Sequence, residues 1–202
     1  MRWLLVLWDI DFTLINAAGV GTRLYRMVFR DMFGTELPSA ADMAGRTDRA
    51  IVLDTLAQAG IPEPRRHLDQ FLARLAALAP AGRELAVQHS RALPGATAVL
   101  DALAAFAPSR DARRTTGGPR HESPAPTRDG AGDGAPDVCV VQSVLTGNVR
   151  SMAEMKLGAV GLDGYLDLEA GAYGESHEIR SELVHLARGN AARRYGRGFA
   201  GT

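Results

Sequence analysis

The feature that most constrains this chain is an apolar run near its N-terminus, Trp3-Leu-Leu-Val-Leu-Trp8, which ends in Asp9-Ile-Asp11. An uninterrupted apolar run is typical of a parallel strand that is covered on both faces of its sheet. Ligand sites in such sheets lie beyond the carboxyl ends of the strands. We therefore expect an α/β fold in which Asp9 and Asp11 lie at a functional edge.

The two acids are separated by one residue, so their side chains share a face if the strand continues and diverge if a turn begins between them. In either case, a carboxylate pair can bind a hard cation such as Mg²⁺, which takes oxygen ligands. One carboxylate can also attack phosphorus while the other exchanges a proton with the leaving group or water. A helix cap or a polar turn is the alternative interpretation.

A second apolar run, Val138–Leu145, ends in Thr146-Gly-Asn148 and repeats this arrangement. Alone, Thr-Gly-Asn is a common turn, but after an apolar strand it is more specific. The helix expected to begin near Val149 carries Lys156, the only lysine in the chain. The alternative for Lys156 is a solvent-exposed helix residue.

These motifs resemble those of the haloacid dehalogenase-like hydrolase superfamily, in particular phosphoglycolate phosphatase-like members with a helical cap. The first motif is matched by Asp9, Asp11 and Thr13. The resemblance implies that Asp9 is the nucleophile, forming an aspartyl-phosphate, and that Asp11 is the general acid/base. It also implies Mg²⁺ as cofactor, bound by the Asp9 carboxylate and the Asp11 backbone carbonyl. Phe12 stands where many members have glycine, which puts a bulky ring near the site.

The resemblance assigns substrate contacts as well. The hydroxyl of Thr146 would hydrogen-bond the transferring phosphoryl group, with the backbone N–H groups of Gly147 and Asn148 as further donors. Lys156 would neutralise charge between nucleophile and phosphate, and Arg180 is the rival for this role. Thr13 completes the first motif beside the substrate.

Segment 15–90 has a helical pattern of apolar residues and no strand signal. We expect it to be an α-helical cap inserted into a Rossmann-like core that consists of 1–14 and 91–202. Closure of such a cap would exclude water and bring specificity residues to the substrate. An ordinary helical lobe without a gating role is the alternative.

Within this segment, Gly45-Arg-Thr-Asp48 resembles an element at the cap-core boundary of phosphoglycolate phosphatase-like members. Arg46 could contact a substrate anion. Thr47 or Asp48 could instead act as the N-cap of the following helix, and both interpretations can hold together.

Composition limits the partners. The chain has 202 residues, of which 46% are hydrophobic, with 23 Lys and Arg against 23 Asp and Glu. It therefore has no overall charge to attract nucleic acid or a membrane, and we expect a small phosphorylated metabolite as its partner. The single cysteine, Cys139, excludes an internal disulfide, and the N-terminal apolar run is too short for a membrane span. We expect a cytoplasmic protein.

Two regions depart from the family pattern. Residues 108–136 are rich in Pro, Gly, Arg and Asp without apolar periodicity, which predicts a disordered insertion. The fourth motif, G-D-x-x-x-D, is absent from the sequence up to Thr202. We therefore expect a core that is incomplete at the C-terminus, weak Mg²⁺ binding, and an exposed sheet edge through which the chain could self-associate.

The leading hypothesis is Mg²⁺-dependent hydrolysis of a small phosphate monoester, impaired by the truncation. The alternative from another class is a catalytically inactive, truncated remnant. A phosphomutase would use the same two acids. A 2-haloacid dehalogenase is less expected, because that subgroup lacks the second acid that Asp11 supplies.

Overall fold

The structure, a computed structural model, describes residues 1–108 and 138–199. The insertion predicted at 108–136 lies, apart from its first residue, outside the described residues. The elements follow in the order β1 (Arg2–Trp8), β2 (Ile15–Asn16), α1 (Val20–Phe33), α2 (Asp48–Gln58), α3 (Pro64–Ala77), α4 (Ala79–His89), β3 (Arg91–Ala92), α5 (Ala96–Ala104), β4 (Val138–Val144), α6 (Arg150–Ala159) and α7 (Glu182–Tyr195), with short 3-10 helices at Asp163–Tyr165 and Leu168–Ala170 before α7.

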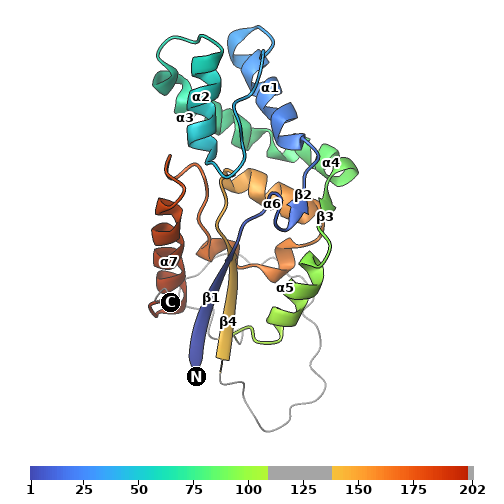
Figure 1. The fold of residues 1–202 in the computed structure, drawn as a ribbon, viewed down its shortest axis with the longest axis vertical. Helices are drawn as coiled ribbons and strands as arrows, with labels where there is room; N and C mark the ends of the chain where they lie inside the picture. The colour runs from blue at the N-terminus through green and yellow to red at the C-terminus, as the bar shows by residue number, and fades with distance from the viewer. Residues whose placement is uncertain (109–137, 200–202) are drawn as a thin grey trace.

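The two apolar runs of the sequence form neighbouring parallel strands. β1 and β4 pair in register from Arg2 opposite Val138 to Trp8 opposite Val144, and they lie side by side in Figure 1. Both strands therefore end at the same edge of the sheet. The α/β fold class predicted from the sequence is confirmed by this pairing and by the helices around it.

Helices cover both faces of the strand pair, α5 and α6 on one and α7 on the other (Figure 1). Because side chains alternate along a strand, Trp3, Leu5 and Leu7 of β1 pack on the α7 side. Val144 of β4 packs with α5 and α6 on the other side, beside Ile10, which is fully buried just beyond β1. This layering explains why both runs are apolar without alternation.

Four helices, α1 to α4, form a separate lobe between β1 and β3, at the top of Figure 1. The segment expected to be helical from residue 15 begins instead with β2, which pairs antiparallel with β3. The chain thus enters and leaves the helical lobe through two adjacent short strands. We call α1 to α4, with the loops that join them, the cap.

The cap rests on α6 and shares one hydrophobic cluster with it. Val149, Met152 and Met155 of the α6 region belong to the same buried cluster as the cap residues. The contact is close at Gly82 of α4, where a Cβ atom would lie 2.9 Å from the sulfur of Met155. The cap is therefore docked on the core in this structure.

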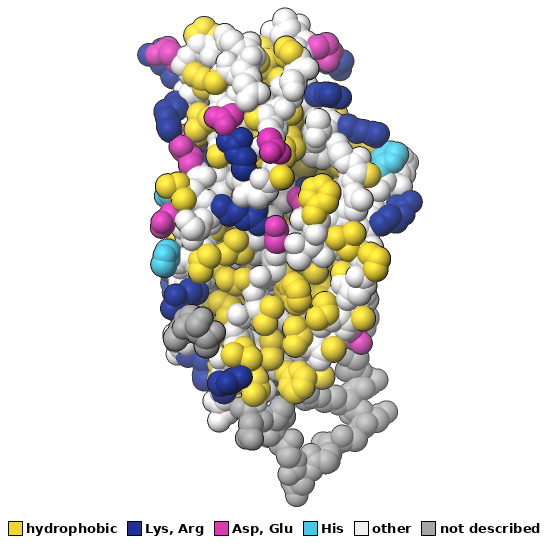
Figure 2. Space-filling model, viewed as in Figure 1, with side chains coloured by type: hydrophobic (Ala, Val, Ile, Leu, Met, Phe, Trp, Pro, Cys, Tyr) yellow, Lys and Arg dark blue, Asp and Glu magenta, His cyan; other side chains and the backbone are white. Residues whose placement is uncertain are grey.

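β1 has one strand neighbour within residues 1–108 and 138–199, and its residues from Trp3 to Trp8 are only partly buried. Figure 2 shows hydrophobic side chains gathered over the lower half of the molecule, where β1 lies in the same view of Figure 1. The self-association predicted from an exposed sheet edge stays a prediction. Within the described residues, no helix has the length and apolar character that a membrane crossing requires.

Candidate active site

A tight turn directly after β1 separates the two acids. The carbonyl oxygen of Ile10 accepts hydrogen bonds from the backbone N–H groups of Leu14 and Ile15, both at 2.9 Å. Phe12 takes a left-handed backbone conformation, with φ of 60°, which costs a residue with a side chain about 1–2 kcal/mol. Of the two arrangements left open by the sequence, the structure has the turn, and the Phe12 side chain is exposed.

Asp11 is bound by two side chains from the core. Its carboxylate oxygens accept hydrogen bonds from Nζ of Lys156 at 2.9 and 2.7 Å and from Nδ2 of Asn148 at 2.8 Å. Lys156 also donates to Oδ1 of Asn148 at 2.7 Å and is 4% exposed. A buried ammonium group is tolerated only when it is paired and hydrogen-bonded, as it is here.

Asp9 has a different cation. Its Oδ1 accepts a hydrogen bond from the backbone N–H of Ile10 at 2.8 Å, and its Oδ2 lies 2.7 Å from a guanidinium nitrogen of Arg180. Arg180 reaches the acid from the loop before α7. Lys156 and Arg180, the two candidates for neutralising charge between nucleophile and phosphate, therefore pair with different acids. Lys156 pairs with Asp11, and Arg180 pairs with Asp9.

Thr146 lies fully buried beside this network. Its Oγ1 accepts hydrogen bonds from Nδ2 of Asn148 at 2.7 Å and from the backbone N–H of Asn148 at 3.2 Å. A hydroxyl group has one donor and two acceptor positions, so the Thr146 hydrogen remains for a further acceptor. Asn148 thus connects Thr146 with Asp11 and Lys156.

Gly147 is required by close packing of backbones. A Cβ atom at this position would lie 1.8 Å from the carbonyl oxygen of Arg46, and one at Gly174 would lie 1.7 Å from the carbonyl oxygen of Gly147. The loop after β4, the loop before α7 and the start of α2 therefore meet at distances that only glycine permits.

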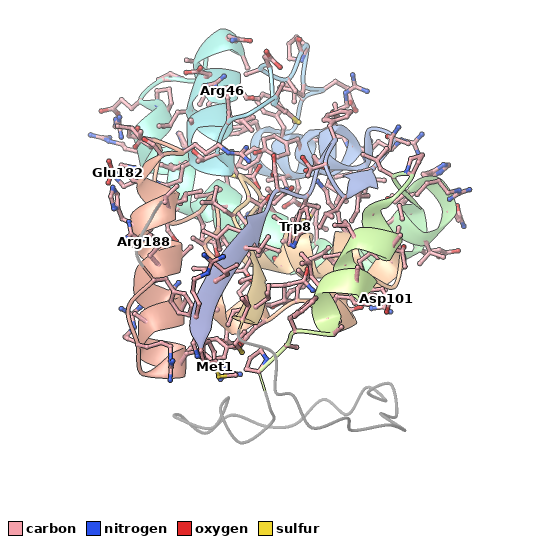
Figure 3. All side chains as sticks on the ribbon, turned by 60° about the horizontal axis from the view of Figure 1, so that its bottom comes forward. Met1, Trp8, Arg46, Asp101, Glu182 and Arg188 are labelled. Carbon is pink, nitrogen blue, oxygen red and sulfur yellow. The ribbon has the colours of Figure 1, made fainter. Side chains whose placement is uncertain are left out.

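One predicted substrate residue, Arg46, has its side chain elsewhere. The guanidinium group of Arg46 donates to the side chain of Asp54 and to the carbonyl oxygens of Asp42 and Ala50 within the cap. Figure 3 shows Arg46 in the cap, apart from Trp8 at the end of β1. Thr13 is exposed, and its backbone N–H donates to Ile10 at 3.3 Å. The structure does not bring the Arg46 side chain to the acid pair.

Asp48 is a site residue whose part the sequence did not reveal. Its Oδ1 accepts a hydrogen bond from the Tyr25 hydroxyl and its Oδ2 one from the backbone N–H of Val149, both at 2.7 Å. Its own N–H donates to Gly147 at 2.7 Å. Thr47 is the N-cap of α2, as one interpretation of this segment expected, whereas Asp48 reaches across to the core.

The environment of Asp48 shifts two pKa values. Burial raises the pKa of Asp48, opposed by the hydrogen bonds from Tyr25 and Val149 and by the charge of Lys156. Burial and the adjacent Asp48 carboxylate raise the pKa of Tyr25 well above its ordinary value. The nearby Asp11 carboxylate also raises the pKa of Asp48, so the cap and the acid pair are coupled electrostatically.

The described residues do not form a good Mg²⁺ site as they stand. Asp9 and Asp11 are each bound to a side-chain cation. The described residues contain no group of three or more His, Cys, Asp or Glu that could hold a metal ion. Mg²⁺ takes about six oxygen ligands, several of them water, and is held by carboxylates that are free to bind it.

Two surface hollows lie away from the acids. They have volumes of about 330 and 390 Å³ and share Arg150 and Glu175 in their walls. Neither is lined by Asp9, Asp11 or Lys156. These two hollows are therefore not the binding site for a substrate of the acid pair.

No family model and no curated protein matches the chain. Solved structures do. A candidate phosphoglycolate phosphatase from Lactobacillus plantarum aligns with a TM-score of 0.51 and 15% identity, over 95% of this chain and 72% of that one. A candidate phosphatase from Clostridium difficile has a TM-score of 0.47 and 14% identity, over 92% and 69%. A candidate β-phosphoglucomutase from Thermotoga maritima has a TM-score of 0.41 and 14% identity, over 93% of this chain and 69% of that one.

The likeness to the first of these structures concerns the fold, because the identity is low. It agrees with the parallel strand pair, the helices on both of its faces and the helical lobe between β1 and β3. The chain therefore has a Rossmann-like α/β fold that it shares with this solved structure.

Proposed function

We propose that the chain hydrolyses small phosphate monoesters through an aspartyl-phosphate on Asp9. One observation carries the proposal: Asp9 and Asp11 follow β1 at the edge where β4 ends, each paired with a cation. A carboxylate beside a positive group, close to hydroxyl and guanidinium donors, is suited to receive and stabilise a phosphoryl group.

In the first step, a carboxylate oxygen of Asp9 attacks phosphorus and the bond from phosphorus to the ester oxygen breaks. Asp11 acts as the general acid and gives a proton to the departing oxygen, so that the alcohol leaves neutral. The Arg180 guanidinium beside Asp9 and the hydroxyl hydrogen of Thr146 would donate to the developing charge.

In the second step, water attacks phosphorus and the bond between phosphorus and Asp9 breaks, which releases inorganic phosphate. The carboxylate of Asp11 accepts the proton of the attacking water and is ready for the next cycle. Lys156 and Asn148 fix the orientation of Asp11 throughout, because together they make three hydrogen bonds to its two oxygens.

Magnesium, which the sequence resemblance implies, has no step in this scheme. The scheme uses only groups of the chain, because both carboxylates already carry side-chain cations. Whether added Mg²⁺ changes the rate is part of the test.

The test is release of phosphate from a panel of small phosphomonoesters, with and without Mg²⁺. Asp9→Asn should abolish turnover, because an amide does not form the aspartyl-phosphate. Asp101→Asn on α5, an exposed acid at the side of the core in Figure 3, is the matched control and should keep full activity.

Other outcomes select other functions. No turnover by wild type, or equal turnover by Asp9→Asn, rejects hydrolysis through Asp9. The first of these outcomes makes the inactive remnant the better description, whereas the second requires another nucleophile. Transfer of the phosphoryl group to a sugar phosphate in place of water would identify a phosphomutase.

A further inference from the structure

The loop that delivers Arg180 to Asp9 is held by the cap. The backbone N–H of Arg49 donates to the carbonyl oxygen of Gly174 at 3.4 Å, and its guanidinium group donates to the carbonyl oxygen of Glu175 at 3.4 Å. Both acceptors lie in the loop before α7. Cap residues thus hold this loop by its backbone.

Nearest to Arg180, two further cap residues bind Glu178. The hydroxyl of Thr47 donates to its carbonyl oxygen at 2.9 Å, and the Arg65 guanidinium donates to both of its carboxylate oxygens at 2.7 and 3.1 Å. The Arg65 pair is exposed and therefore contributes little. Thr47 itself is fully buried, so its hydrogen bond to the loop is the better shielded of the two contacts.

Thr47 uses its hydroxyl group twice. Its Oγ1 accepts a hydrogen bond from the backbone N–H of Ala50, which makes it the N-cap of α2, while its hydrogen is donated to Glu178. The next residue, Asp48, holds the loop after β4 through Gly147 and Val149. The start of α2 therefore contacts both loops that carry the candidate catalytic groups.

We propose that Thr47 is a positioning residue, which fixes the loop before α7 so that Arg180 lies against Asp9 only while the cap is docked. Cap docking and neutralisation of the nucleophile are then one event. The consequence for the reaction rests on the proposed function. The coupling between cap docking and the position of Arg180 does not rest on the proposed function, because it can be measured in an inactive protein.

The kinetic test compares Thr47→Val with Thr47→Ser. Valine keeps the shape of threonine and loses the hydroxyl group, whereas serine keeps it. Thr47→Val should lower kcat about tenfold, the effect of one lost hydrogen bond of about 1.4 kcal/mol, and Thr47→Ser should restore it. In the Arg180→Ala background, Thr47→Val should change kcat less than about twofold, because neighbouring effects that act through one group are not additive.

Arg65 and its neighbour Arg66 provide a matched pair of controls. Arg65 binds Glu178 of the loop, whereas Arg66 pairs with Glu63 within the cap, and both side chains are exposed. Arg65→Ala should lower kcat slightly, and Arg66→Ala should leave it unchanged. If Thr47→Val lowers kcat equally with and without Arg180, the proposal is overturned, because Thr47 would then act only through the stability of α2.

A thermodynamic cycle tests the coupling without activity. Urea unfolding of wild type, Asp9→Asn, Arg180→Ala and the double variant gives the coupling between the two side chains. With wild-type Thr47 or Thr47→Ser, the coupling between Asp9 and Arg180 should correspond to at least about a threefold change in the unfolding constant. In the Thr47→Val background, this coupling should vanish. An unchanged coupling in that background rejects the positioning role of Thr47, whereas inactivity of the wild type with a lost coupling rejects only the proposed hydrolysis.

Discussion

The ammonium group of Lys156 lies 2.7 Å from one carboxylate oxygen of Asp11 and 2.9 Å from the other. This pair joins the end of β1 to α6 and thereby fixes the second acid of the site to the helix on which the cap rests. Lys156 is buried, whereas about a third of the Asp11 side chain is exposed.

Removal of Lys156 alone should destabilise the protein more than removal of both charges of the Lys156–Asp11 pair. Lys156→Met leaves the Asp11 charge without its cation and should lower the free energy of unfolding by about 1–3 kcal/mol, less than for a fully buried pair because Asp11 is partly solvated. Asp11→Asn combined with Lys156→Met should regain part of this loss. Urea unfolding measures both, and a double variant less stable than Lys156→Met would contradict a charge-compensation role.

Asp48 should give the protein a pH dependence of known sign. Its pKa is raised in the folded state, so its contribution to stability is fully present below the unfolded value of 3.8 and is lost as pH rises through the folded value. The Tm of wild type relative to Asp48→Asn should therefore rise as pH falls from neutral. Asp101→Asn serves as the control, and a difference between wild type and Asp48→Asn that does not change with pH would reject this account.

The glycines where the three backbones meet should not tolerate a methyl group. Gly147→Ala and Gly174→Ala place a Cβ atom within 2 Å of a carbonyl oxygen, and each should cost more than about 3 kcal/mol of stability or undock the cap. Gly21→Ala in α1 is the control, because nothing lies within 4 Å of its Cβ position. It should stabilise the helix by up to about 1 kcal/mol, and thermal unfolding separates the two cases.

Magnesium should stabilise the wild-type chain only slightly. At a concentration equal to its Kd, a ligand stabilises by about 0.4 kcal/mol, or about 1–2 °C in Tm for a chain of this size, and we expect no more than this at about 1 mM. Arg180→Ala frees the Asp9 carboxylate and should respond more strongly to Mg²⁺. Asp9→Asn combined with Arg180→Ala should lose that response. A large shift in the wild type that EDTA reverses would mean that the carboxylates exchange their side-chain cations for the metal.

Local patterns were sufficient to predict the fold. The apolar runs predicted β1 and β4 because strands covered on both faces need apolar residues throughout, and the helix expected to begin near Val149 is α6. The sequence therefore placed Asp9 and Thr146 at one edge of a sheet before any contact was known.

Contacts between distant segments were not predictable in the same way. Arg46 and Asp48 belong to one short polar segment, yet Arg46 turns into the cap and Asp48 reaches Val149 of the core. Which of them faces the core depends on how the cap docks, and single residues in a turn carry no signal for that. The same holds for Arg180, whose contact with Asp9 depends on the path of a loop.

The shared cluster of the cap and α6 has a consequence for synthesis of the chain. Val149, Met152 and Met155 complete a cluster whose other members lie in the cap and precede them in the sequence. On the ribosome, the four cap helices therefore emerge before the side chains that cover their apolar face. Part of the apolar surface of the cap therefore stays uncovered until α6 has been made, and exposed apolar surface of this kind favours aggregation.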